Sequence, residues 1–126
     1  MATISRQTER WEQIGTLVIA INVQVTTTPI TADSFVRYAG IAIVTPTALT
    51  GTVLLEGLIS ETADYTVETS FQPINSAGSD ITLTADKIIV IPTEQLAVPA
   101  IAAISSSNEA AARTFTVFGI RPASNS

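Results

Sequence analysis

Carboxylates are the side chains of this sequence whose spacing comes nearest to a catalytic arrangement. The chain contains no histidine and no cysteine, so the usual general base at neutral pH and the thiolate nucleophile are both absent. Glu56 and Glu68 lie on outward-facing rows of two consecutive predicted strands, and a glycosidase needs two opposed carboxylates in a cleft. Acids on the solvated face of a β-sandwich more commonly keep the protein soluble or protect a sheet edge. We interpret the pair in that way, predict no catalytic residue, and expect that the protein is not an enzyme.

Other acids lie in predicted turns, where calcium commonly finds oxygen ligands. Glu61 and Asp64 share one loop, and Asp80 and Asp86 flank a short strand. Neither place has the D-x-[DN]-x-[DN]-G spacing of a calcium loop, so we interpret these acids as turn-capping residues. Lys87 is the single lysine, and nothing in the sequence supplies a serine nucleophile in the setting that a Ser/Lys dyad requires. We predict no metal ion and no cofactor.

The length and charge of the chain exclude further classes of function. The 126 residues fit one domain with one hydrophobic core. The net charge is −5 and the six basic residues form no run, so we expect neither a nucleic-acid partner nor a polybasic membrane anchor. The longest apolar run, residues 17–21, is far short of the ~20 residues that span a bilayer. The N-terminal stretch MATISRQTERWEQIG has no apolar signal core, so we expect no secretion signal and no membrane partner.

The composition also predicts an uncharged surface. Charged residues make up 13% of the chain, against about 25% in ordinary soluble domains, and hydrophobic residues make up 46%. A small all-β domain still has much surface to cover. We therefore expect that the uncharged surface, rich in Thr, Ser and Ala, is covered by other subunits.

Apolar and polar residues alternate along most of the chain, which predicts β-strands separated by turns rich in Pro, Gly, Ser and Asn. The expected strands span residues 14–25, 35–44, 53–59, 65–72, 81–83, 87–91, 100–104 and 114–120. Regular short strands are typical of a sandwich, a barrel or a jelly roll. We expect an all-β fold, an antiparallel, jelly-roll-like β-sandwich of about eight strands.

Composition shifts divide the chain into a polar N-terminal arm (residues 1–13), a β-sandwich domain (residues 14–121) and a flexible C-terminal tail (residues 122–126). Within the domain, residues 87–91, KIIVI, are apolar on both faces. That pattern indicates a central strand or a strand covered by an interface.

Aromatic and basic residues near the two ends of the domain are the candidate contact residues. Phe115 and Phe118 lie on opposite faces of the last strand, so at least one of them is outside the core, and we favour Phe118 as the exposed one. Trp11 is either a local lid or an anchor in a neighbouring subunit. Arg113 and Arg121 bracket the last strand and pair with acids within the domain or across a subunit boundary. The predicted interface comprises Trp11, Arg10, Phe118, Arg113 and Arg121.

Residues 98–121, VPAIAAISSSNEAAARTFTVFGIR, resemble a recurrent ending of small virion proteins of tailed bacteriophages. The shared pattern is a proline-led strand, a Ser/Ala-rich loop, Arg-Thr-Phe, and a final alternating strand that ends near a glycine. Residues 53–57, VLLEG, resemble the strand that precedes a polar turn in those proteins. This chain departs from the pattern there, because LISETAD replaces their Asp-Gly-bearing turn.

The resemblance implies a jelly-roll or sandwich domain that decorates or cements a capsid, commonly as a homotrimer. The implied partners are further copies of the chain and the major capsid protein or other virion proteins, within a virion assembled in the host cytoplasm. The arm, residues 1–13, would reach a neighbouring capsid subunit. Two alternatives remain: a component of a tail, a fibre or a head–tail connection, and a carbohydrate-binding β-sandwich module. Most aromatic residues lie on rows with aliphatic neighbours, which favours a core over a sugar-binding platform.

Overall fold

The strands of this protein pair in a nested order, the first with the last and so on inward. A computed structural model describes residues 11–26, 28–60, 70–76 and 78–121. Four antiparallel pairs form the nest. They are β1 (Trp11–Ile19) with β10 (Arg113–Ile120), β2 (Ile30–Thr31) with β9 (Ala100–Ser105), β3 (Gly40–Val44) with β8 (Ile88–Pro92), and β4 (Val53–Leu58) with β5 (Phe71–Pro73).

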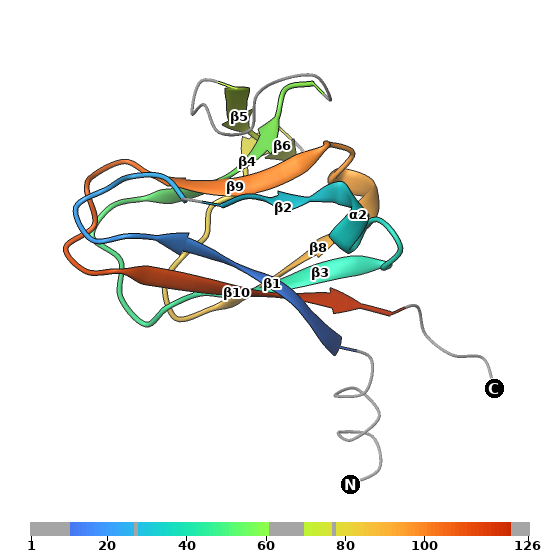
Figure 1. Cartoon of the computed structure of the whole chain (residues 1–126), viewed down its shortest axis with the longest axis horizontal. Helices are drawn as coiled ribbons and strands as arrows, with labels where there is room; N and C mark the ends of the chain where they lie inside the picture. Colours follow the sequence, from blue (N-terminus) through green and yellow to red (C-terminus); the bar gives the residue numbers. More distant parts are fainter. Residues whose placement is uncertain (1–10, 27, 61–69, 77, 122–126) are drawn as a thin grey trace, which may run out of the picture.

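These strands make two four-stranded antiparallel sheets that lie face to face (Figure 1). Sheet A has the order β1-β10-β3-β8, and sheet B has the order β2-β9-β4-β5. The chain therefore crosses repeatedly between the layers, and each sheet interleaves early and late strands. This is the strand order of a jelly roll, a hairpin rolled into two sheets. The predicted fold class is confirmed.

The hydrophobic core fills the space between the two sheets. In β10, Phe115 and Val117 are fully buried, whereas Thr116 between them is only partly buried. The same alternation buries Leu17 and Ile19 in β1. Strand residues alternate between the two faces of a sheet, so the residues between these core positions face away from the sandwich.

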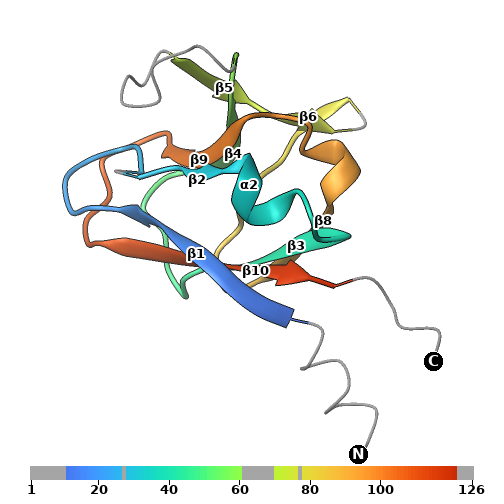
Figure 2. The same ribbon diagram turned by 45° about the vertical axis from the view of Figure 1, so that its right-hand side comes forward.

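The connection between β2 and β3 differs from the prediction. A strand over residues 35–44 was expected, but residues 32–35 form the short helix α2 (Ala32–Phe35), and β3 begins only at Gly40. The Ala32 N–H donates to the Pro99 carbonyl (2.8 Å), and the Phe35 side chain is 1% exposed. Figure 2 shows α2 at the end of the sandwich, between the two layers. A helical turn places Phe35 in the core there, and this tertiary contact decides the local structure.

The first strand also begins and ends earlier than expected. It starts at Trp11, so residues 11–13 of the predicted arm belong to β1, and it ends at Ile19. Asn22 follows in a turn with a φ of 65°, a left-handed conformation that asparagine tolerates. The remainder of the predicted arm, the predicted tail at residues 122–126, and residues 65–69 of the fourth predicted strand lie outside the described residues.

A small hairpin stands where the sequence predicts only a turn. Strands β6 (Asn75–Ser76) and β7 (Ser79–Asp80) pair with each other, and Gly78 between them has a φ of 87°, which glycine adopts readily. The predicted strand at residues 81–83 is reduced to an isolated bridge between Thr82 and Leu54. A 3₁₀ turn, η2 (Thr93–Gln95), follows β8.

Candidate interaction surface

The outer face of sheet A is a grid of three rows across four strands. Residues that pair directly in a sheet share a face, so the register of neighbouring strands defines each row. We call this surface the outer face. Its rows are Trp11, Ile120, Gly40 and Pro92; then Gln13, Phe118, Ala42 and Val90; then Thr16, Thr116, Val44 and Ile88.

None of the residues in these three rows is charged, and only Gln13, Thr16 and Thr116 are polar. The solvent-facing side of an antiparallel sheet is normally polar. The exposed apolar side chains are concentrated at one border of the grid, where Ile88 is 58% and Val90 60% exposed. The outer face therefore has the composition of a surface that another molecule covers.

Trp11 and Phe118 form an aromatic pair at the other side of the grid. Their ring centroids are 5.4 Å apart and the ring planes are tilted by 38°. Both side chains are half-buried, and neither belongs to the core between the sheets. Phe115 is fully buried on the opposite face of β10, so Phe118 is the aromatic residue outside the core, as expected, but it is half-buried rather than exposed. The structure thus brings two of the predicted contact residues together.

The outer face has the size of the largest apolar patch on a typical monomer and is small for an interface. Strands about 4.8 Å apart and rows about 6.8 Å apart give the grid a footprint on the order of 400 Å². The largest apolar patch of a typical monomer covers about 300–600 Å² and is often functional. A standard protein–protein interface buries about 800 Å² on each partner. The outer face therefore supplies about half of one.

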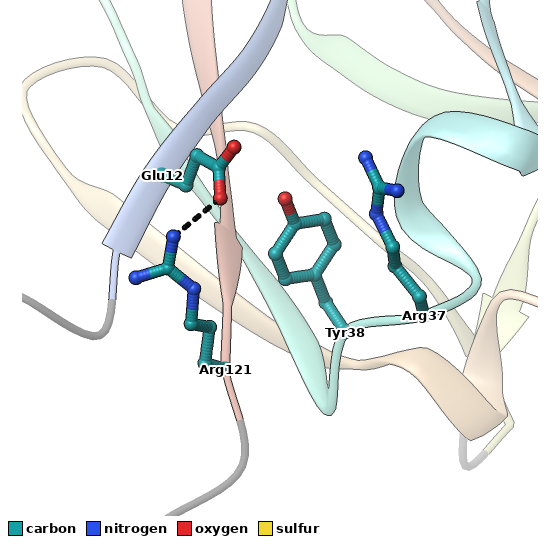
Figure 3. Close-up of a pocket in the computed structure, with 4 residues that line it drawn as sticks. All are labelled: Glu12, Arg37, Tyr38 and Arg121. Carbon is teal, nitrogen blue, oxygen red and sulfur yellow. Dashed lines mark hydrogen bonds and ion pairs between the residues drawn. The ribbon is translucent and has the colours of Figure 1, made fainter.

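A polar corner lies where β1 begins and β10 ends, on the side of sheet A opposite the outer face (Figure 3). Glu12 and Arg121 form an ion pair, with 2.6 Å between the Glu12 Oε1 and an Arg121 guanidinium nitrogen. Tyr38 points its hydroxyl toward the Glu12 carboxylate, and Arg37 stands with its guanidinium 5.6 Å from the centre of the Tyr38 ring. These residues line an open hollow of about 570 Å³. We call this group of four residues the corner cluster.

The register of β1 and β10 explains how the corner cluster forms. Glu12 lies opposite Gly119, and the Tyr38 ring packs where a side chain on Gly119 would be, because a Cβ there would come within 2.6 Å of the ring. A hydrogen bond from Tyr38, then one from Arg121, lowers the pKa of Glu12 below its usual value. A guanidinium group has five N–H donors, so Arg37 and Arg121 of the corner cluster can receive the carboxylate or carbonyl oxygens of a partner.

Arg113, by contrast, lies at the opposite end of β10 from the corner cluster. Its Nε donates to the Glu109 carboxylate (2.8 Å), and its side chain is 16% exposed. The sequence left open whether Arg113 and Arg121 pair with acids within the domain or across a subunit boundary. Both arginines pair with an acid within the domain. Arg113 therefore serves to hold a loop end, and Arg121 belongs to the corner cluster. Arg10, the fifth predicted contact residue, lies outside the described residues.

Glu109 is a buried carboxylate that joins three loops at this end of the sandwich. It accepts hydrogen bonds from the N–H groups of Thr50 (2.8 Å) and Gly51 (3.0 Å) and from the Ser105 hydroxyl (2.7 Å). Its own backbone carbonyl accepts from the Asn22 N–H (2.8 Å). The connections β1–β2, β3–β4 and β9–β10 are thus tied together. Burial alone would raise the pKa of Glu109, but these hydrogen bonds and Arg113 lower it to about 2.

Sequence reasoning missed the importance of Glu109 and the environment of Glu56. Glu109 lies in a Ser/Ala-rich segment that reads as a turn, and no local pattern marks a carboxylate whose donors come from residues 50 and 51. Glu56 was expected on a solvated row but is 4% exposed in β4. Glu68, its proposed neighbour, lies outside the described residues. The spacing of charged residues within one strand carries no information about what covers that strand.

Three comparisons place no known protein beside this chain. No family model matches it, and neither does any curated protein or solved structure. Within residues 11–26, 28–60, 70–76 and 78–121, no three His, Cys, Asp or Glu side chains are grouped as a metal site would require. Over the same residues, every helix falls short of the length and apolar character needed to cross a bilayer.

Proposed function

We propose that this chain is a structural protein of a bacteriophage particle, which decorates or cements the capsid through the outer face of sheet A. One observation carries the proposal above the others: three rows of a sheet face contain no charged residue. An apolar sheet face is stable in a protein when another surface covers it. The partner would be the major capsid protein or another virion protein.

The mechanism would be burial of surface in many symmetric copies. A footprint on the order of 400 Å² is half of what each partner of a standard interface contributes, so one contact of this kind would be weak. A decoration protein, however, binds a lattice of identical sites, and several linked contacts raise the overall affinity. The aromatic pair Trp11–Phe118 would be the anchor, since buried aromatic side chains commonly dominate binding.

The alternatives differ in how well the site supports them. A component of a tail, a fibre or a head–tail connection would use the same outer face, so only the position in the particle separates it from a capsid protein. A carbohydrate-binding module needs an exposed aromatic platform. Tyr38 does not offer one, because it is 6% exposed, with Gly119 under its ring and Arg37 near its centre. Trp11 and Phe118 are half-buried, and their ring planes are tilted by 38° instead of forming one flat surface. The glycan alternative therefore has less support.

Mass spectrometry of purified particles tests the proposal, followed by a low-resolution particle reconstruction. We expect copy numbers close to that of the major capsid protein and density on the outer surface of the head. A few copies per particle would move the protein to the tail. Absence from particles, together with a clear signal on a glycan array, would replace the proposal by the carbohydrate-binding alternative.

A further inference from the structure

Strand β8 forms one border of sheet A, and its outer edge has no partner among the described strands. It pairs with β3 on one side only. Two hydrogen bonds outside the ladder fix its orientation: the Thr45 N–H donates to the Lys87 carbonyl (3.0 Å), and the Thr93 N–H donates to the Ala39 carbonyl (3.0 Å). In an antiparallel pair, residues that bond to the partner alternate with residues that do not. The bonding positions of β8 toward β3 are therefore the odd-numbered ones.

It follows that Ile88, Val90 and Pro92 turn their backbone groups away from β3. Pro92 agrees with this assignment, because a proline in a sheet occupies a position whose missing N–H would face the free edge. Ile88 and Val90 each keep an N–H and a carbonyl for a further strand. Their side chains, 58% and 60% exposed, lie on the outer face beside that edge. An edge with free backbone groups and apolar side chains is a template for another strand.

We propose that two copies of this protein pair through β8, antiparallel, about a two-fold axis at Ile89. Ile88 of one copy then lies opposite Val90 of the other, and both residues are bonding positions toward the edge. This register uses both free donors and both free acceptors of each chain. It also sets β-branched side chains directly opposite each other, which is a favourable cross-strand pair.

The charges at the two ends of β8 favour this antiparallel arrangement over a parallel one. Asp86 and Lys87 precede the strand and Glu94 lies in η2, which follows it, and all three residues are exposed. Antiparallel pairing brings the Glu94 end of one strand toward an end of the other where Asp86 and Lys87 carry opposite charges. Parallel pairing would set Glu94 beside Glu94, and like charges opposite each other are destabilising.

The pairing would also join the two outer faces into one surface. Two sheets of the order β1-β10-β3-β8 become continuous through β8, and the uncharged footprint doubles from about 400 to about 800 Å². That is what one partner contributes to a standard interface. The dimer does not depend on the proposed function; the doubled face is what would make it useful for binding to a particle.

Hydrogen exchange of the purified full chain, followed amide by amide at rising protein concentration, tests the pairing directly. In the monomer, the Ile88 and Val90 amides face solvent and exchange fast. When nine-tenths of the chains are paired, exchange through the remaining monomer slows these two amides about tenfold. Sedimentation should show a dimer over the same range. Protection elsewhere on the outer face, with these amides unchanged, would overturn the proposal.

Two variants of one residue separate edge pairing from contact through the face. Val90→Pro removes an N–H that β3 does not use, so the dimer should be lost while β-sheet circular dichroism is retained. Val90→Thr keeps the N–H and the β-branched shape, so its dimer should persist. Should Val90→Pro fail to fold, the exchange measurement on the unmodified chain still decides. A monomer at the highest soluble concentration would overturn the proposal, and so would a trimer, because a three-fold ring needs a contact between two different surfaces.

Discussion

Trp11 opens β1 and packs against Phe118 of β10, with 5.4 Å between the ring centroids. Trp11 pairs with Ile120, and Gln13 with Phe118, so the two aromatic rings meet on a diagonal across neighbouring strands. Diagonal neighbours in a sheet lie within reach of aromatic side chains. The pair joins the first strand of the described chain to the last and gives the outer face its aromatic anchor.

Truncating either aromatic residue should weaken binding to the particle far more than it weakens the fold. We expect Trp11→Ala and Phe118→Ala each to cost about 2 kcal/mol of binding, roughly 30-fold in Kd. The free energy of unfolding should fall by about 1 kcal/mol, because both side chains lie outside the core. Binding to purified capsids and denaturant unfolding measure the two effects. Val36→Ala is the control: it truncates a side chain that is 64% exposed and away from the outer face, and equal loss of binding there would contradict the assignment of the surface.

The predicted role of the N-terminal arm requires a shorter deletion than the sequence suggested. Removing residues 1–13 would also remove the first three residues of β1, which begins at Trp11. Deleting residues 2–10 leaves that strand whole. We expect the deletion to weaken particle binding while β-sheet circular dichroism stays unchanged. Binding equal to that of the full chain would remove the arm from the mechanism.

Replacing Glu109 by glutamine should destabilise the protein in a pH-dependent way. The pKa of Glu109 is lowered from 4.5 to about 2 in the folded state, so the carboxylate stabilises the fold above pH 4.5. That contribution, on the order of 3 kcal/mol, is lost as the pH falls from about 4.5 toward 2. Glu109→Gln should therefore cost about that much at pH 7 and progressively less at lower pH.

Urea unfolding at a series of pH values measures this difference between the two proteins. Glutamine keeps the volume of glutamate but turns an N–H₂ group toward groups that already donate, the N–H groups of Thr50 and Gly51 among them. Glu94→Gln is a matched control, because Glu94 is exposed. A Glu109→Gln penalty that does not change between pH 7 and pH 2.5 would contradict the electrostatic account.

Gly119 should not tolerate a methyl group. A Cβ at this position would come within 2.6 Å of the Tyr38 ring, and overpacking of this kind costs about 1–3 kcal/mol. We expect Gly119→Ala to lower the melting temperature accordingly. In a double-mutant cycle with Tyr38→Ala, the alanine at 119 should cost much less, because the ring is gone. Equal costs in the two backgrounds would place the strain elsewhere.

Tyr38→Phe should raise the pKa of Glu12. The hydrogen bond from Tyr38 is the first cause of the lowered value, followed by the one from Arg121, and Arg37 contributes only through its charge. Removing the hydroxyl therefore moves the pKa toward that of an ordinary glutamate, whereas Arg37→Gln should move it less. A carboxyl-carbon NMR titration of Glu12 measures both shifts. A larger effect of Arg37→Gln would show that charge, rather than hydrogen bonding, sets the state of the corner cluster.

The fold class followed from the sequence because burial imposes a period of two on every strand with one face in the core. β4 and β10 lie where alternation places them, and Phe118 is on the side that alternation predicts. The strand predicted around Phe35 was wrong, because that prediction also used only the local alternation of residues. Its alternation fits a strand, but the contact of Ala32 with Pro99 comes from residues far along the chain, and no local pattern contains it.

The interaction surface was only partly predictable. Trp11 and Phe118 could be chosen as contact residues, but their pairing depends on the register of β1 with β10. The KIIVI segment indicated either a central strand or a strand covered by an interface. The first alternative is wrong, because β8 is a border strand of its sheet, and the second stays a prediction. Its position could not be predicted, because alternation defines faces and leaves strand order open. The corner cluster brings together residues 12, 37, 38 and 121, and that meeting is a property of topology alone.

The nested strand order constrains how the chain can be synthesised and folded. β10 is the last of the described strands along the chain, yet it lies inside sheet A, between β1 and β3. Until the ribosome has released Ile120, β1 has no neighbour in its sheet and sheet A is incomplete. Assembly of sheet A must therefore wait until β10 has been synthesised, and long-range pairing such as Trp11 with Ile120 makes for slow folding. During that interval, the incomplete sandwich would expose its apolar core residues to water, and chaperones could bind them.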